Sequence, residues 1–223
     1  MCLGEQLDMY ELRVKYEDEE ILLNTYSDMD QGYRLHYGDH RDQQCKLLFQ
    51  DTCPFDIYDD FHRSPITLPE PKNPTSESFK KVLEKTDSGI VINSDENLAL
   101  WGKRLCQSRI FAFAHYGCGA DTSEAILMTR LEKVQLFSYQ KFLETWYSSA
   151  QNRSPLPDPV VHLAFGKKPR TWNSRVFINA KLVPKAAESL KNLLTSSLDS
   201  LKFSSEKSYD KQIRKEHMLP IFG

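Results

Sequence analysis

The chain lacks the features that would send it into a membrane or to the secretory route. Its longest apolar stretches, such as residues 160–165 apart from His162, fall far short of the roughly 20 residues that a membrane-spanning helix needs. Glu5, Asp8 and Glu11 interrupt any apolar segment near the amino terminus, so we expect no secretory leader. We therefore expect no membrane partner.

Cysteine and net charge are scarce as well. Five cysteines in 223 residues form an odd, sparse set, which favours reduced thiols in the cytosol or nucleus over a disulfide framework. The formal net charge is -2, whereas non-specific binding to a phosphate backbone needs a clustered basic excess. We therefore expect no direct nucleic acid partner for this segment, and a location in nucleus and cytoplasm.

Apolar residues, in contrast, are plentiful. Hydrophobic residues make up 40% of the chain and charged residues 27%, a balance typical of a globular protein. The length suits one large domain, and no repeat or clear linker divides it. We predict one domain over residues 1–198 and a regulatory or flexible tail over residues 199–223 that packs on it.

Residue patterns predict an α+β fold. Residues 9–16 alternate between apolar and charged side chains, which is typical of a half-buried strand. Prolines between residues 51 and 75 predict a long connection that lacks regular structure for most of its length. Helices are predicted to begin at Ser76, at Tyr139 and at Pro184. Further strands are predicted at 21–26, 33–37, 89–93, 98–101, 108–114, 131–137, 160–165 and 175–183.

Several segments, taken in order, carry a resemblance to one family. They are residues 9–16, 32–35, 87–92, 103–110, 136–143, 161–166 and 181–187. The most specific is the run from Arg104 to Ile110. These segments resemble the carboxy-terminal association domain of the interferon regulatory factors, and the sequence of the run from Arg104 to Ile110 is most similar to the lymphoid branch.

The resemblance implies a Smad/FHA-like β-sandwich flanked by helices, without catalytic activity or a cofactor. It implies binding to transcription factors, to family members as homo- or heterodimers, and to coactivators of the CREB-binding-protein type. The tryptophan-rich DNA-binding half of such factors is not recognised in this chain. We therefore expect an excised domain or a truncated homologue; the alternative is a virus-encoded mimic that blocks assembly of host factors or coactivators.

The resemblance also implies a site for phosphoserine. A phosphoserine carries nearly two negative charges and three acceptor oxygens, so its receptor needs converging cations. Ser204 is the candidate phosphoacceptor, although a serine-rich surface tail is the simpler reading of its surroundings. The candidate receptor could equally be a solvated strand edge; it comprises Arg104 and Arg109 with Gln107 between them, completed by Arg130 or Lys133.

Partner-interface candidates come from two further features. The helix predicted from Tyr139 carries more apolar surface than one core-facing stripe needs, which makes Tyr139 and Trp146 candidates beside their default role in the core. Family members often carry acidic residues after the position of Gly166, where this chain has Lys167 and Lys168. Charge complementarity chiefly sets partner choice, so both lysines are candidates.

Metal and thiol chemistry have weaker support. The His and Cys residues between positions 36 and 53 lack the paired short spacings of structural zinc sites. His115 and Cys118 share a glycine-containing loop and could suggest a thiol enzyme, but no orienting third group is evident. We therefore predict no catalytic residue and no metal ligand.

Overall fold

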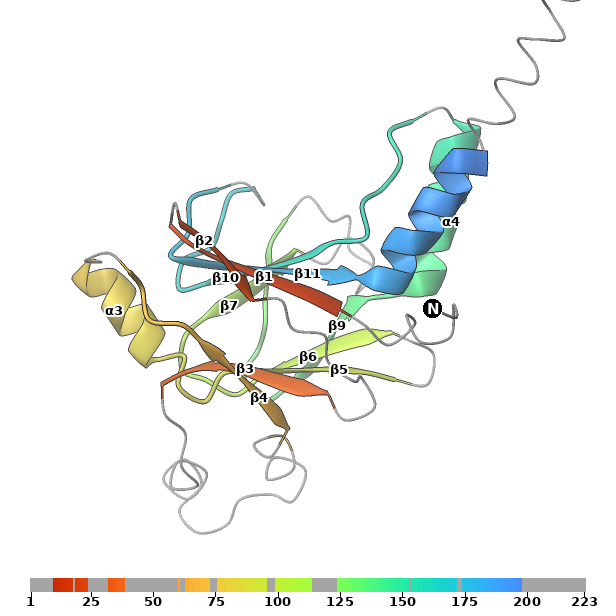
Figure 1. Cartoon of the computed structure of the whole chain (residues 1–223). Coiled ribbons are helices and arrows are strands. Elements are labelled where there is room, and N and C mark those ends of the chain that lie inside the picture. The colour runs from red at the N-terminus through yellow and green to blue at the C-terminus, as the bar shows by residue number, and fades with distance from the viewer. Residues whose placement is uncertain are drawn as a thin grey trace, which may run out of the picture.

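Two β-sheets stack face to face in the computed structural model, with helices at the ends of the stack (Figure 1). The structure describes residues 10–17, 19–23, 32–38, 60, 63–72, 76–95, 99–113, 124–152, 154–171 and 174–197. Within these ranges, one sheet has the strand order β2-β1-β11-β10-β7-β8 and the other the order β4-β3-β5-β6-β9. This is the predicted α+β sandwich.

The first sheet is antiparallel throughout. In β1 the inward side chains from Tyr10 to Tyr16 are buried, so the predicted alternation is confirmed. The register places Tyr10 opposite Pro184 and Tyr16 opposite Ile178. Its strands are β1 (Tyr10–Tyr16), β2 (Glu19–Leu23), β7 (Ile110–Phe113), β8 (Ile126–Leu127), β10 (Val161–Phe165) and β11 (Ile178–Pro184).

The second sheet corrects the predicted connection between residues 51 and 75. Ser64–Leu68 forms strand β4, which pairs in parallel with β3. β4 is an edge strand, and an edge position tolerates Pro65 because its missing amide hydrogen is not needed on the open side. The other strands are β3 (Tyr33–Tyr37), β5 (Ile90–Ser94), β6 (Leu100–Arg104) and β9 (Lys133–Phe137).

Serine caps begin the two named helices. In α3 (Glu77–Glu84) the Ser76 hydroxyl accepts from the Phe79 amide at 3.2 Å, as predicted. In α4 (Tyr139–Gln151) the Ser138 hydroxyl accepts from the Lys141 amide at 3.3 Å. Residues 185–197 are also helical. Figure 1 shows α3 at one end of the sandwich and the other two helices at the opposite end.

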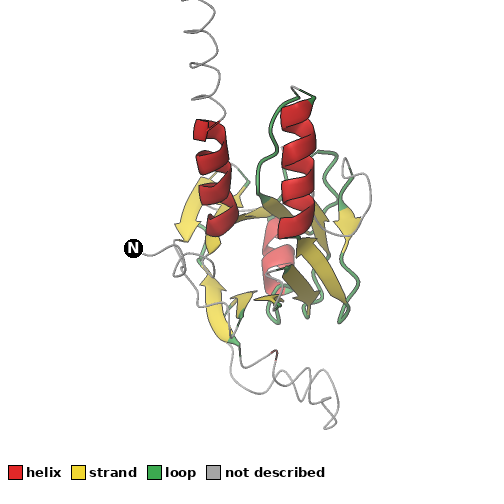
Figure 2. Ribbon diagram, turned by 90° about the vertical axis from the view of Figure 1, so that its right-hand side faces the viewer, coloured by secondary structure: helices red, strands yellow, loops and turns green. Residues whose placement is uncertain are grey.

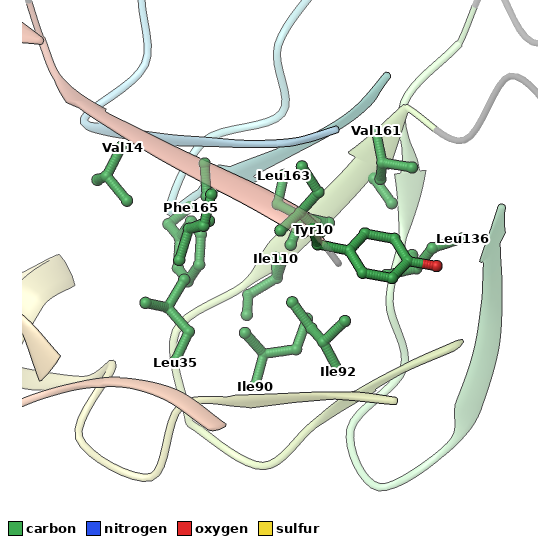
Figure 3. Packing of buried hydrophobic residues seen from close by; sticks show 14 of the residues in the cluster. Tyr10, Val14, Leu35, Ile90, Ile92, Ile110, Leu136, Val161, Leu163 and Phe165 are labelled. Atoms are coloured by element: carbon green, nitrogen blue, oxygen red, sulfur yellow. The ribbon is translucent and has the colours of Figure 1, made fainter. Parts of the chain in front are cut away.

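The core fills the space between the sheets. Leu163 and Phe165 from β10 point toward Ile90 and Ile92 from β5 (Figure 3), and all four side chains are fully buried. Burial of one such side chain stabilises a fold by about 1.5–3 kcal/mol. The two faces therefore hold the sheets together and fix the positions of the loops at each end.

Some predictions fall outside the described residues. The His115 and Cys118 loop and the phosphoacceptor candidate Ser204 are among them. In the part of the chain that the structure describes, no helix is long and apolar enough to cross a membrane. No group of three or more metal-ligating side chains occurs there either.

Candidate functional site

Two arginines lie side by side where β6 ends. Arg104 is the last residue of β6, and Arg130 forms a parallel bridge with it. Arg104 Nη1 donates to the carbonyl oxygen of Ser108 at 3.0 Å, and Arg130 Nε donates to that of Leu105 at 2.8 Å. Both guanidinium groups therefore contact the turn formed by residues 105–108.

Gly89 fixes the backbone of this turn. Its carbonyl oxygen accepts from the amides of Leu105 and Cys106, at 3.0 and 2.9 Å. Gly89 has a φ of +74°, and a Cβ at this position would overlap the carbonyl oxygen of Leu35 on β3. Since only glycine adopts such a conformation without strain, the residue type at position 89 holds the arginine-bearing turn in place.

The arginine pair is electrostatically suited to an anion. Burial lowers the pKa of Arg104, and the neighbouring charge of Arg130 lowers it further. Arg104 Nε is buried and has no hydrogen-bond acceptor among the described residues. A phosphate group between the two arginines would supply that acceptor and remove the repulsion between like charges.

Cys106 lies in the same turn but is chemically quiet. Its side chain is fully buried, and burial raises the pKa of its thiol to about 12. The thiol therefore stays protonated at neutral pH, and a protonated thiol is a poor nucleophile. Cys106 acts as a small core residue.

The structure separates Arg109 from this pair. The carbonyl oxygen of Arg109 accepts from the Gly166 amide at 2.8 Å, which places the residue beside the turn that carries Lys167 and Lys168. Both lysines are exposed, as are Arg109 and Gln107. Arg109 therefore belongs with the Lys167 and Lys168 turn, and Gln107 is the exposed residue of the turn beside Arg104.

Lys133 lies elsewhere again. It pairs with Lys103 across β6 and β9, and its Nζ lies 4.8 Å from the ring centroid of Trp101. Successive side chains of a strand point to opposite faces, so Lys103 and Arg104 point to opposite faces of β6. The cation–π contact therefore holds Lys133 away from Arg104.

The helical end of the sandwich presents apolar side chains to solvent. Trp146 is 7% exposed and packs in the core, and the half-buried Tyr139 contacts Phe137 edge to face, with ring centroids 5.1 Å apart. Their neighbours on α4 are exposed instead, Leu143 to 40% and Tyr147 to 63%. The exposed apolar side chains of α4 are thus Leu143 and Tyr147, not Tyr139 and Trp146, which the sequence singled out.

The helix over residues 185–197 adds to this surface. Its Leu193 is 55% exposed, and Lys191 is ion-paired with Asp158 of the segment that follows α4. Figure 2 shows the two helices standing at the same end of the sandwich, with that segment between them. Leu143, Tyr147 and Leu193 are hereafter called the helical-end surface.

Comparison with known proteins gives the fold and the site a context. The family model described as interferon-regulatory factor 3 matches residues 7–195. The chain belongs to the interferon regulatory factor family. The matched part is its association domain, and the resemblance carried by the segments from residue 9 to residue 187 is confirmed. No curated protein matches the chain in sequence.

Solved association domains share this fold. The chain is similar to the crystal structure of the interferon regulatory factor 9 association domain, with a TM-score of 0.58 and 17% identity. That match covers 88% of this chain and 93% of the other. A chain of the crystal structure of STAT2 in complex with IRF9 gives a TM-score of 0.57 at 18% identity, covering 83% and 95%. The predicted Smad/FHA-like sandwich is confirmed.

Proposed function

We propose that this association domain is a non-enzymatic binding module that assembles transcription regulators. Transcription factors, family members and coactivators of the CREB-binding-protein type are its partners. The neighbour solved in complex with STAT2 supports a transcription-factor partner for this fold. The module extends over residues 1–198, acts in nucleus and cytoplasm, and is followed by a regulatory tail.

One observation carries this proposal. Of the four large hydrophobic side chains exposed among the described residues, three belong to the helical-end surface. Exposed apolar side chains that cluster on adjoining elements mark protein interaction sites. An amphipathic partner segment would bury Leu143, Tyr147 and Leu193 together, because their two helices stand at the same end of the sandwich.

The arginine pair gives the module a second docking point. Arg104 and Arg130 would receive the phosphate of a phosphoserine, either from a partner or from Ser204 of the tail. Charge-assisted hydrogen bonds to phosphate are among the strong ones in proteins. Phosphorylation would then add an attraction at the end of β6, away from the helical-end surface.

Calorimetric titration tests the helical-end proposal. The probe is a purified coactivator of the CREB-binding-protein type, titrated into the wild type and into a Leu143→Asp, Leu193→Asp variant. Loss of interface anchors costs more than about 1 kcal/mol each, so we expect affinity to fall at least about tenfold. Both side chains are partly exposed, and aspartate has a lower helix propensity than leucine, so the melting temperature should fall by no more than a few degrees.

A matched variant provides the control. Glu144 and Thr145 are exposed on α4 near Leu143, and their replacement by alanine should leave affinity near the wild-type value. Equal affinity of wild type and the Leu143→Asp, Leu193→Asp variant would contradict the assignment of this surface.

The second candidate is a virus-encoded mimic with the same surfaces. Such a mimic would occupy coactivators without delivering them to DNA, and would act as a decoy. In a reporter assay, a decoy lowers transcription driven by a complete host factor, whereas an activating partner raises it. Relief of that inhibition by Leu143→Asp with Leu193→Asp would assign the decoy activity to the helical-end surface.

A further inference from the structure

The hairpin of β10 and β11 concentrates positive charge. Between Asp158 and Glu188 the sequence contains no acidic residue, although the whole chain carries a formal net charge of -2. The cations of this stretch are Lys167, Lys168, Arg170, Arg175, Lys181 and Lys185. The β10–β11 hairpin therefore contains basic residues and no acidic residue.

These cations lie on the solvent side of the sandwich. Lys167, Lys168, Arg170 and Arg175 are exposed on the loop that joins the two strands. On β11 the inward side chains from Ile178 to Leu182 pack in the core, so the alternation of strand side chains places Lys181 on the outer face.

The neighbouring strands extend the positive outer face. The register places Lys181 directly opposite Arg13 on β1 and His162 on β10. Arg109 adds a further cation next to the start of the loop, through the hydrogen bond of its carbonyl oxygen with the Gly166 amide. β1, β10 and β11 therefore bring Arg13, His162 and Lys181 to the same side of one sheet, and Arg109 lies beside the loop that carries Lys167 and Lys168.

Acidic residues neutralise part of this charge. Lys168 lies 3.7 Å from Glu124, but the two side chains are 58% and 82% exposed, and such pairs contribute little. Glu11 is already shared between Arg13 and Lys185. Glu17 lies at the same end of the sheet, where its amide donates to the carbonyl oxygen of Phe177 at 3.0 Å.

Several loop and strand cations are left over. Lys167, Arg170 and Lys181 form no ion pair with the residues that the structure describes. An acidic ligand would therefore gain attraction without first breaking an internal pair.

An apolar side chain adjoins the cations and indicates the kind of ligand. Leu127 on β8 is 48% exposed. It follows Glu124, the ion-pair partner of Lys168, by three residues. It lies opposite Phe111, whose ring belongs to a small cluster on the outer face with Phe113 and Val176. A phosphate backbone would leave Leu127 in water, whereas a peptide with alternating acidic and apolar residues would cover it.

We propose that the β10–β11 hairpin and the outer face beside it bind an acidic segment of a partner protein, with Leu127 receiving one of its apolar side chains. This inference deepens the proposed partner-binding function and rests on it. The surface differs from both the helical-end surface and the Arg104 and Arg130 pair. It selects partners by charge, because Lys167, Arg170 and Lys181 form no ion pair with the described acidic residues.

Fluorescence anisotropy tests the proposal with a labelled twelve-residue peptide of alternating Glu and Leu. A second peptide carries Gln in place of every Glu, and a twelve-nucleotide single-stranded DNA is the third probe. Lys167→Glu with Arg170→Glu should weaken the acidic peptide roughly tenfold, because two attractions become repulsions. Lys72→Glu with Lys80→Glu makes the same charge change on exposed positions elsewhere and should have little effect.

Tighter binding of the acidic than of the Gln peptide, lost in the hairpin variant alone, supports the proposal. Equal binding of the two peptides, or an unchanged hairpin variant, overturns it. DNA that binds more tightly than the acidic peptide overturns the choice of partner. If the hairpin variant keeps wild-type affinity while Leu143→Asp with Leu193→Asp loses its coactivator, the inference fails and the proposed function stands.

Discussion

Replacing Arg104 with alanine separates binding from folding. The guanidinium donates one hydrogen bond to the Ser108 carbonyl oxygen at 3.0 Å, and such a bond contributes about 0.5–1.5 kcal/mol to stability. Removal of the repulsion with Arg130 offsets part of that loss. In a domain of this size about 1 kcal/mol corresponds to roughly 2–4 °C, so the melting temperature should fall by no more than a few degrees.

The effect on phosphate binding should be larger. A hydrogen bond to a charged group contributes about 1.5–3 kcal/mol, and about 1.4 kcal/mol corresponds to a tenfold change in affinity. Arg104→Ala should therefore weaken a phosphoserine ligand roughly tenfold to a hundredfold, with Arg130→Ala similar. Arg104→Lys should recover part of the affinity, because lysine keeps the charge but loses the planar donor pair.

Fluorescence anisotropy with a labelled peptide of residues 199–210, phosphorylated at Ser204, measures this effect. The unphosphorylated peptide is the ligand control. Arg109→Ala is the protein control and should cost less, because Arg109 lies beside Gly166 rather than beside Arg130. Equal affinity of the wild type and Arg104→Ala, or equal affinity for the two peptides, would refute the assignment of the phosphate to this pair.

Three further predictions concern folding and are checked by thermal or denaturant unfolding. Phe165→Ala should lower the free energy of unfolding by about 3–5 kcal/mol, because the ring is fully buried between the sheets; a loss below about 1 kcal/mol would contradict the core. Gly89→Ala should lower it by at least about 1–3 kcal/mol, because its φ is +74°; a stabilised variant would contradict the turn geometry. The hydrogen bond from Arg13, and a second from Lys185, hold the pKa of Glu11 below its usual 4.5. That contribution is present above pH 4.5 and is lost as the pH falls through the lower folded value. Glu11→Gln should therefore cost about 1 kcal/mol at pH 7, and the difference should shrink in acid; a pH-independent difference would exclude this cause.

The fold could be read from the sequence wherever one periodicity dominated. The alternation in β1 and the Ser76 cap of α3 were both predicted, because each is set by residues close in sequence. β4 was missed because prolines argue against a strand, and edge position is a property of the whole sheet. β8 has two residues, too few to show any period.

In the candidate site, too, contacts between residues distant in the sequence could not be predicted. The sequence singled out Arg104, Arg109 and Arg130 as candidates, but spacing alone could not show that the turn after Arg104 places Arg109 beside Gly166. The pairing of Arg104 with Arg130 depends on a bridge across 26 positions of the chain, from residue 104 to residue 130. Leu143 and Tyr147, four positions apart, could have been found as a second apolar stripe beside that of Phe142 and Trp146.

Amide chemical-shift mapping of the labelled protein tests the central proposal most directly, namely that the ends of a rigid sandwich bind partners. The measurement follows the spectrum during addition of a purified coactivator of the CREB-binding-protein type. We predict shifts concentrated in residues 139–151 and 185–197, with the amides of β3 and β5 unchanged. Shifts spread through the strands of both sheets, or an absence of shifts in the two helices, would contradict the proposal.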